Sequence, residues 1–583
     1  MKKNKDSFDD PITTEVVRGL LDSAAEEVQQ VLYKVSHSPL ITDGRDSTSD
    51  GRDSTSALFD AQGRTIAQAT AVPCHLGCLQ DLGRIFASHF NHQANEGDVY
   101  IHNDPYNGGT HLPDLAIVSP VFLKSKLIGY VATMSHHADI GGFAPGSVNF
   151  AAKDLYAEGL ILSMATIVKN GKVNEPLFDT ILANSRVPDT LKGDLGGQIA
   201  ACLTGVKRYK EIISKIGLKK VQKCVESLLD YSERMTRNEI KKIPNGEYYF
   251  EDFLDDDSLE SSAKPVKICV TLKVKGSNLE FDFDGTDNQV DIAINNVPSC
   301  PNSVVYYAVR TLTGDKVPNN EGSFRPITIK LPKGSIVNST FPAPVAVRGI
   351  TLKRVEDVVC GVMAKALPER MTAAHSGQYT MVNFVGFDIN GKRIQGHMGG
   401  PYAGGHGARS NKDGIDVTEH GATNGSPIPI EVSESKLPIL FRKSLLWTDS
   451  GGAGKWRGGL GYTAEVEWMG GECYGSFRRD RMKFKPWGIE GGHDAPLCKT
   501  QIISKKQKYS LPGKIDTPIS KGDIIKIHTT GSGGFGNPEK RDPELVLDDY
   551  VNRKISSSAA KNIYKVIIKN NQVDYKKTNS LRA

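Results

Sequence analysis

The chain has 583 residues, of which 39% are hydrophobic and 24% are charged, and its formal net charge is +5. This length is too great for one ordinary domain, and the composition is that of a folded protein rather than a disordered one. The lysines gather in the last eighty residues and around Lys219 and Lys220 without interleaved aromatic residues, which argues against a nucleic-acid-binding protein.

Membrane and disulfide signals are weak. The opening M-K-K-N-K-D-S-F-D-D-P has no apolar segment, and no uninterrupted apolar run approaches eighteen residues. We therefore expect a cytoplasmic protein without a membrane span. The nine cysteines lack C-x-x-C spacing, so disulfides are not expected.

Residues 10–36 predict a long amphipathic helix, and a seven-residue repeat follows it. D-G-R-D-S-T-S stands at 43–49 and again at 50–56, which is too short a repeat for a solenoid. We interpret it as a duplication that lengthens a polar loop. Residues 57–69 then predict a β-hairpin, and a helix begins at His75, a position where histidine is more often a cap or a hydrogen-bond partner than a metal ligand.

Two apolar runs, 115–122 and 127–134, flank a polar tip and predict an antiparallel hairpin with buried faces. Polar residues stand at the open end of this hairpin, where antiparallel pairing brings the two strand ends together. They are His111 and Asp114 before the first strand, and His136, His137 and Asp139 after the second.

Two imidazoles and a carboxylate meeting at one point indicate a Zn, Mn or Fe site with open positions. Asp104 and Asp139 are candidates for a further ligand or for an acceptor that fixes a histidine tautomer. The alternative is a polar turn cluster whose histidines are only hydrogen-bonded, because H-x-x-D and H-H-x-D are short motifs.

The remainder of the chain predicts a helical region at 195–240, a boundary near 244–246, and then mainly strands and Gly-rich turns. Further helices are expected at 299–313, 351–367 and 543–566. The predicted fold class is α+β and multidomain, with a mixed helical and strand N-terminal part that holds a metal site and a β-rich, Gly-rich C-terminal half. The predicted domains are an N-terminal metal-site domain at 1–243, an α+β middle domain at 244–385 and a β-rich domain at 386–583.

Two short motifs admit more than one interpretation. D-F-D-G-T at 282–286 matches the nucleophile loop of haloacid-dehalogenase phosphatases, but the alternation before it is that of an antiparallel strand rather than of a first parallel strand. G-S-G-G-F-G at 531–536 offers backbone amides to a phosphate, yet no Lys-Ser/Thr follows it, so a tight structural loop is the favoured interpretation.

Eight segments in sequence order resemble one family. They are S-A-L-F-D-A-Q-G, P-C-H-L-G, N-D-P-Y-N-G-G-T-H-L-P-D, S-H-H-A-D-I-G-G, N-S-R-V-P, G-D-L-G-G-Q-I-A-A, F-P-A-P-V-A-V-R and G-G-F-G-N-P-E-K-R-D-P-E-L-V. Together they resemble the hydantoinase B/oxoprolinase family, which comprises the B subunit of N-methylhydantoinase-type enzymes and the C-terminal half of eukaryotic 5-oxoprolinase.

The resemblance implies an ATP-dependent cyclic amide hydrolase. A partner A subunit of the actin-like ATPase superfold would bind ATP and phosphorylate a carbonyl oxygen, and this chain, as the B subunit, would open the activated lactam or imide with water, in an A2B2 assembly. The family's metal pattern falls on Asp53, His111, Asp114 and His136. The chain departs from the family at Ser54, where an aromatic residue is usual, and the tandem repeat offers Asp46 as a rival to Asp53.

Roles beyond the ligands follow as hypotheses. His137 and Asp139 are candidates for proton transfer or for hydrogen bonds that support the ligands, since the adjacent His136 and His137 would face opposite sides of an extended strand. Arg348 is a candidate for binding a substrate carboxylate, with a structural salt bridge as its alternative. Two rival functions remain: a subunit of an acetone or acetophenone carboxylase-like enzyme, and a non-catalytic assembly partner.

Overall fold

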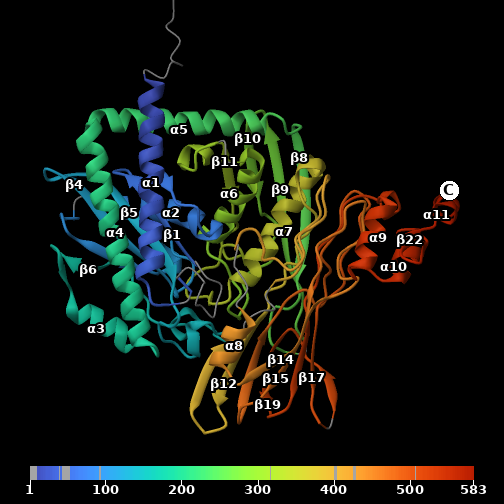
Figure 1. Cartoon of the computed structure of the whole chain (residues 1–583). Coiled ribbons are helices and arrows are strands. Elements are labelled where there is room, and N and C mark those ends of the chain that lie inside the picture. Colours follow the sequence, from blue (N-terminus) through green and yellow to red (C-terminus); the bar gives the residue numbers. More distant parts are fainter. Residues whose placement is uncertain are drawn as a thin grey trace, which may run out of the picture.

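The structure is a computed structural model that describes residues 10–38, 40–41, 53–90, 93–260, 262–314, 317–398, 403–423, 429–505 and 507–583. Its N-terminal part is built around a seven-stranded antiparallel sheet of order β2-β1-β5-β4-β3-β6-β7 (Figure 1). The strands are β1 (Ser54–Asp60), β2 (Thr65–Gln68), β3 (Val99–His102), β4 (Asp114–Leu123), β5 (Lys126–His136), β6 (Ala165–Lys169) and β7 (Lys172–Val173).

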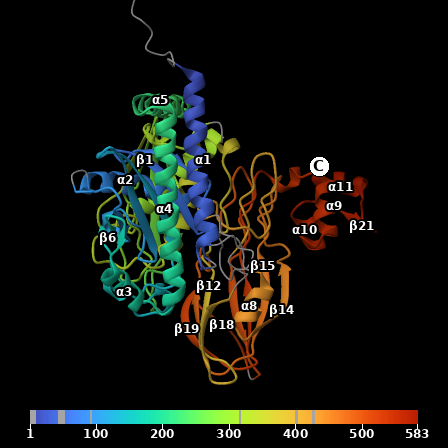
Figure 2. The same cartoon turned by 60° about the vertical axis from the view of Figure 1, so that its left-hand side comes forward.

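Helices cover both faces of this sheet. On one face α1 (Pro11–Val35) and α4 (Pro188–Ile216) run side by side (Figures 1 and 2), and on the other lies α2 (Pro73–Phe90). Alternate residues of β4 therefore point into two different hydrophobic cores. Ile117 packs in the core that α1 and α4 cover, and Val118 packs in the core that α2 covers. Burial on both faces explains why these strands read as continuous apolar runs in the sequence.

The expected N-terminal helix and central hairpin are both present, whereas the expected helix at 195–240 is two helices. Asp10 caps α1 by accepting the Thr13 N–H, and Pro11 opens the helix. Gly217, with φ 92°, separates α4 from α5 (Leu218–Ile240), because only glycine adopts that backbone conformation without strain. The short helix α3 (Glu175–Ala183) was not predicted.

A second sheet of order β11-β10-β9-β8 follows, together with the expected helices α6 (Ser299–Thr313) and α7 (Gly349–Ala366). Its strands are β8 (Gly246–Leu254), β9 (Val266–Lys275), β10 (Asn278–Asp282) and β11 (Ile327–Lys330). The strand β10, which ends at the D-F-D-G-T motif, pairs antiparallel with β9. β10 also pairs parallel with β11, so the motif follows a strand of a mixed sheet and not of the parallel, doubly wound sheet that a phosphatase nucleophile loop requires.

The C-terminal part consists of two packed sheets and a small outlying helical unit, shown in orange and red in Figure 1. One sheet contains β13 (Arg393–His397), β12 (Met381–Phe387), β16 (Cys473–Arg478) and β19 (Lys514–Ile519), and the other β14 (Ile439–Leu446), β15 (Tyr462–Trp468), β20 (Ile524–His528), β17 (Lys499–Ile503) and β18 (Lys508–Ser510). The remaining elements are α8 (Ile430–Lys436), α9 (Pro543–Val551), α10 (Ser557–Asn562), β21 (Ile568–Lys569), β22 (Gln572–Val573) and α11 (Tyr575–Arg582). The single helix expected at 543–566 is thus two.

The α+β, multidomain fold class is confirmed, while the boundaries after 243 and 385 stay predictions. Within the described residues, no helix has both the length and the apolar character that a bilayer crossing requires.

Glycine segments of the C-terminal part pack backbone against backbone. A Cβ on Gly533 would lie 1.9 Å from the Trp487 carbonyl oxygen, and one on Gly459 would lie 1.9 Å from that of Ile415. The amides of Ser532, Gly533 and Gly534 all donate to backbone carbonyls of neighbouring segments. These amides are therefore already engaged, which supports the structural interpretation of the 531–536 loop over a phosphate cradle.

This packing predicts a strong contrast between two Gly→Ala substitutions. Gly533→Ala should lower the free energy of unfolding by about 1–3 kcal/mol or more, because the new methyl group overlaps a fixed backbone oxygen. Gly196→Ala, in the exposed interior of α4 with no atom within 4 Å of its Cβ, should raise it by about 0.5–1 kcal/mol. Thermal unfolding of the two variants tests this, and equal midpoints would contradict it.

Candidate metal centre

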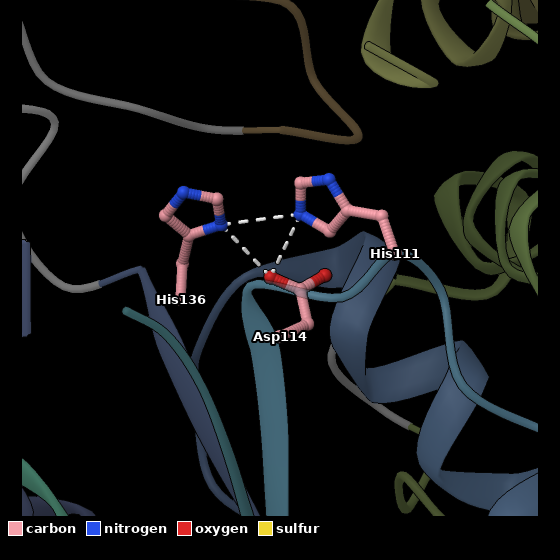
Figure 3. Close-up of side chains that lie close together, drawn as sticks. All are labelled: His111, Asp114 and His136. Carbon is pink, nitrogen blue, oxygen red and sulfur yellow. Dashed lines mark hydrogen bonds and ion pairs between the residues drawn. The ribbon is translucent and has the colours of Figure 1, made fainter. Parts of the chain in front are cut away.

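Three polar side chains meet at the open end of the β4-β5 hairpin (Figure 3). Asp114 is the first residue of β4 and pairs directly with His136, the last residue of β5. His111 lies one turn earlier, where its carbonyl accepts the Asp114 N–H at 3.1 Å. Antiparallel register therefore brings together residues 25 positions apart, as the hairpin pattern predicts.

The three ligand atoms are nearly equidistant. Asp114 Oδ1 lies 3.1 Å from His111 Nε2 and 2.9 Å from His136 Nδ1, and the two nitrogens are 3.1 Å apart. Donor atoms held at 2.0–2.2 Å around one divalent ion are spaced by about 3 Å. The geometry thus fits a single metal ion that touches all three atoms.

The hydrogen bonds of His111 support this fit. Its Nδ1 lies 2.9 Å from the Ala346 carbonyl oxygen, so Nδ1 carries the proton and donates it, and Nε2 presents a lone pair. Burial, opposed by Asp114, lowers the pKa of His111 to about 4, so the ring stays neutral. A lone pair and a carboxylate oxygen that face each other at 3.1 Å can both bind one cation, and a backbone carbonyl on the other ring nitrogen is the usual support of a metal-binding histidine.

The two carboxylate oxygens of Asp114 have different partners. While Oδ1 faces the histidines, Oδ2 accepts hydrogen bonds from His75 Nε2 at 3.1 Å, from the Thr110 hydroxyl and from the Arg348 guanidinium. Burial alone would raise the pKa of Asp114, but His75 and Arg348, which both bond Oδ2, outweigh it and hold this pKa well below its usual range. The carboxylate is therefore ionised although it is completely buried.

Two further predicted residues lie beside this group. Asp53 precedes β1, and its carbonyl accepts the His136 N–H at 3.0 Å. Its carboxylate is not one of the three converging groups, and Oδ1 lies 3.5 Å from His75 Nδ1, so its role as a fourth ligand stays a prediction. The rival Asp46 lies outside the described residues. Arg348 contacts Asp114 itself, which matches the salt-bridge alternative of the sequence analysis.

The other candidates point elsewhere. His137 is buried against α4, with Nε2 2.8 Å from Gln198 Oε1. Asp139 accepts the Gly141 and Gly146 amides and the Arg186 guanidinium, and so orders the loop after β5. Asp104 caps the turn at 105–107. The hydrogen bonds of His137 and Asp139 described here go to residues other than His111, Asp114 and His136. Their proton-transfer roles therefore stay predictions.

The bond from His75 to Asp114 agrees with the role of hydrogen-bond partner that the sequence favours for this residue, whereas sequence reasoning missed a second buried cluster. That cluster comprises Glu356, Asp357, His375, His406 and His420, spread from α7 to the loops after it. No short motif in the sequence indicates this cluster. Its residues meet only because α7 packs against loops that lie up to 64 residues further along the chain.

The metal centre predicts a sharp difference between two adjacent histidines. Purified wild-type chain should carry about one divalent transition metal, and His136→Ala should lose it, because one of three converging donors is removed. His137→Gln, whose amide can still bond Gln198 on the other face of the sheet, should keep it. Mass spectrometry measures the metal content of the wild type and of both variants. A His136→Ala variant with full metal content would show that these three residues do not form a metal site.

Comparisons with known proteins give the family. A family model described as hydantoinase B/oxoprolinase matches residues 10–538. The B subunit of a putative D-/L-hydantoinase from Pseudomonas sp. (strain NS671) is 35% identical, over 98% of this chain and 98% of its own length.

Two solved structures have the same fold. A chain in the crystal structure of the ATP-dependent caprolactamase from Pseudomonas jessenii superposes with a TM-score of 0.89 at 29% identity, over 99% of this chain and 100% of that chain. A chain of the nucleotide-free acetone carboxylase structure also reaches a TM-score of 0.89, over 98% of this chain and 82% of that one, but at 18% identity this likeness shows the fold alone. With the family model matching nearly its whole length, the chain belongs to the hydantoinase B/oxoprolinase family.

Proposed function

We propose that this chain is the metal-bearing hydrolytic subunit of an ATP-dependent enzyme that opens a lactam or cyclic imide ring. The observation that carries the proposal is the convergence of His111, Asp114 and His136. It occurs in a chain that resembles, over its whole length, a chain of an ATP-dependent caprolactamase. Family membership supports action on cyclic amides in general, and the proposal narrows this to hydrolysis at these three residues.

The chain needs a partner for the ATP-dependent step. We find no nucleotide-binding fingerprint in its sequence, and its relatives include proteins named as the B subunit of a hydantoinase and the beta subunit of a caprolactamase. We propose an ATP-binding A-type subunit, in an A2B2 assembly, that phosphorylates the substrate carbonyl oxygen. Phosphorylation is needed because amide resonance makes a lactam carbonyl a poor electrophile.

The residues of this chain then prepare the site for water attack. His111 and His136 present ring nitrogens and Asp114 one carboxylate oxygen, which would hold Zn, Mn or Fe. When bound, such a metal supplies Lewis acidity and lowers the pKa of water towards neutrality. Arg348 and His75 hold the second oxygen of Asp114, so the carboxylate cannot turn away from the site. The Ala346 carbonyl fixes the tautomer of His111.

The test is ring opening by this chain co-purified with its ATP-binding partner. With ATP, the wild-type pair should convert at least one of 5-oxoproline, hydantoin and caprolactam to the open-chain acid. His111→Ala should reduce this rate by at least about 100-fold, because the metal and its activated water are lost, while co-elution with the partner persists. His89→Ala, an exposed histidine on α2, serves as the control and should keep the wild-type rate.

Three results would overturn the proposal. A metal-free wild type that still opens the ring would remove the metal from the mechanism. Incorporation of labelled bicarbonate into a ketone, without ring opening, would assign the chain to carboxylase-like chemistry. Assembly with the ATP-binding partner but no turnover by any pair would leave a non-catalytic partner.

A further inference from the structure

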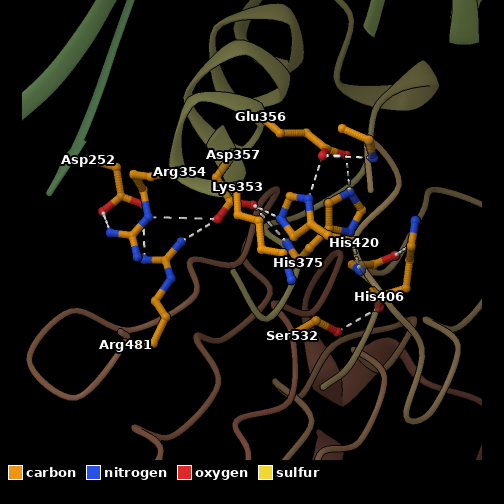
Figure 4. A network of polar contacts seen from close by, with 12 residues as sticks. Asp252, Lys353, Arg354, Glu356, Asp357, His375, His406, His420, Arg481 and Ser532 are labelled. Carbon is orange, nitrogen blue, oxygen red and sulfur yellow. Dashed lines mark hydrogen bonds and ion pairs between the residues drawn. The ribbon is translucent and has the colours of Figure 1, made fainter. Parts of the chain in front are cut away.

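A second buried polar cluster lies between α7 and the C-terminal loops (Figure 4). Glu356 and Asp357 of α7 are completely buried, and His420 and His375 are 2% and 3% exposed. His420 stands between the two carboxylates: Nδ1 contacts Glu356 Oε2, and Nε2 lies 3.5 Å from Asp357 Oδ1. Both ring nitrogens therefore face acceptors, which is the arrangement of an imidazolium.

The charges around His420 agree with this assignment. Burial acts to lower the pKa of His420, but Glu356 and Asp357 outweigh it and raise this pKa to about 9. Asp357 also pairs with Arg481 at 2.6 Å. Arg354 also lies 3.9 Å from Asp357, whereas the ion pairs of Glu356 among the described residues are with histidines alone. A protonated His420 therefore supplies the positive charge beside Glu356, and a neutral one would leave this buried carboxylate uncompensated.

This cluster differs in kind from the metal centre. The Gly407 amide donates to His375 Nδ1 at 3.1 Å, so the proton of His375 sits on Nε2, which faces Glu356 Oε1 at 3.6 Å. No lone pair of His375 or His420 is therefore free to bind a metal, in contrast to His111 Nε2. The cluster acts as an ion-pair clamp.

The clamp is joined to the metal centre through two hydrogen bonds of the Ala422 backbone, one to a side chain and one to a backbone amide. The Ala422 amide donates to Glu356 Oε2 at 2.9 Å, and the Ala422 carbonyl accepts the Cys74 N–H at 3.0 Å. Cys74 stands in the first turn of α2, next to His75, whose Nε2 bonds Asp114 Oδ2. Each contact along this path involves buried residues, so a shift of the Ala422 loop moves the first turn of α2.

The same helix also reaches Asp114 directly. Arg348 caps α7 and bonds Asp114 Oδ2, and Glu356 lies two turns further along the helix. Arg348 therefore stands at the start of the helix that carries Glu356, and His75 stands on a helix whose first turn bonds Ala422, which Glu356 holds. We infer that His420, paired with Glu356, is a positioning residue that holds the start of α2 so that His75 fixes Asp114 for metal binding.

This inference rests on the metal centre of the proposed function, and its test measures Zn2+ affinity rather than turnover. Apo wild-type chain and variants are titrated with Zn2+ against a chelating dye. His420→Asn and Glu356→Gln should each weaken Zn2+ binding by about tenfold, the lower end of the range for groups that support metal ligands. Two variants are used so that a misfolded one does not stop the test, with circular dichroism and elution volume confirming the fold.

Lys353→Gln is the matched control. Lys353 lies on the same helix and forms a buried ion pair with Glu419, the residue before His420, and Glu419 also accepts the Thr423 hydroxyl at 3.0 Å. The pair thus holds the same loop, but the path from Glu356 through Ala422 to Cys74 does not run through it. This variant should lose thermal stability and keep the wild-type Zn2+ affinity. Equal losses of affinity in Lys353→Gln and His420→Asn would show general loosening and overturn the inference.

A double-mutant cycle supplies the sharper criterion. His75→Asn alone should weaken Zn2+ binding by about tenfold, and His75→Asn combined with His420→Asn should weaken it no further, because both act through the same contact. Additive losses, or a folded His420→Asn variant with wild-type affinity, would overturn the positioning role. A wild type that binds no Zn2+ would instead overturn the metal centre itself.

Discussion

The Asp114 carboxylate is the interaction on which the arrangement of this protein depends. It is ionised and completely buried, and a buried charge is tolerated only with well-placed partners. Those partners come from three parts of the chain: Thr110 and the histidines of the hairpin, His75 of α2 and Arg348 of α7. The N-terminal sheet and the middle helices are thus tied together at one carboxylate, which makes the candidate metal centre a composite of segments more than 230 residues apart.

Part of this centre could be predicted from the sequence because it depends on local rules. The alternation of the two apolar runs fixes a hairpin, and antiparallel register then pairs Asp114 with His136, while the turn before β4 places His111 beside them. The same period of two predicts that His137 points to the other face, where it bonds Gln198. The α+β class follows from the succession of periodicities in the same way.

The rest depends on packing that no short pattern records. The sequence leaves Arg348 open between a substrate carboxylate and a salt bridge, and only the placement of α7 brings it to Asp114. His420 and Glu356 are 64 residues apart, and nothing near either residue in the sequence marks them as partners. The break at Gly217 was missed because apolar spacing continues across it, while a single positive φ redirects the chain.

The glycine segments of the C-terminal part have a consequence for the thermodynamics of unfolding. Elsewhere the core is made of apolar side chains, whose exposure to water raises the heat capacity, whereas these segments bury peptide groups against peptide groups. Exposure of polar surface lowers the heat capacity. The glycine-rich region therefore adds little to the heat capacity of unfolding, and so little to the curvature of the free energy of unfolding with temperature. The backbone contacts of this region should persist on cooling, when the hydrophobic contribution of the neighbouring cores weakens.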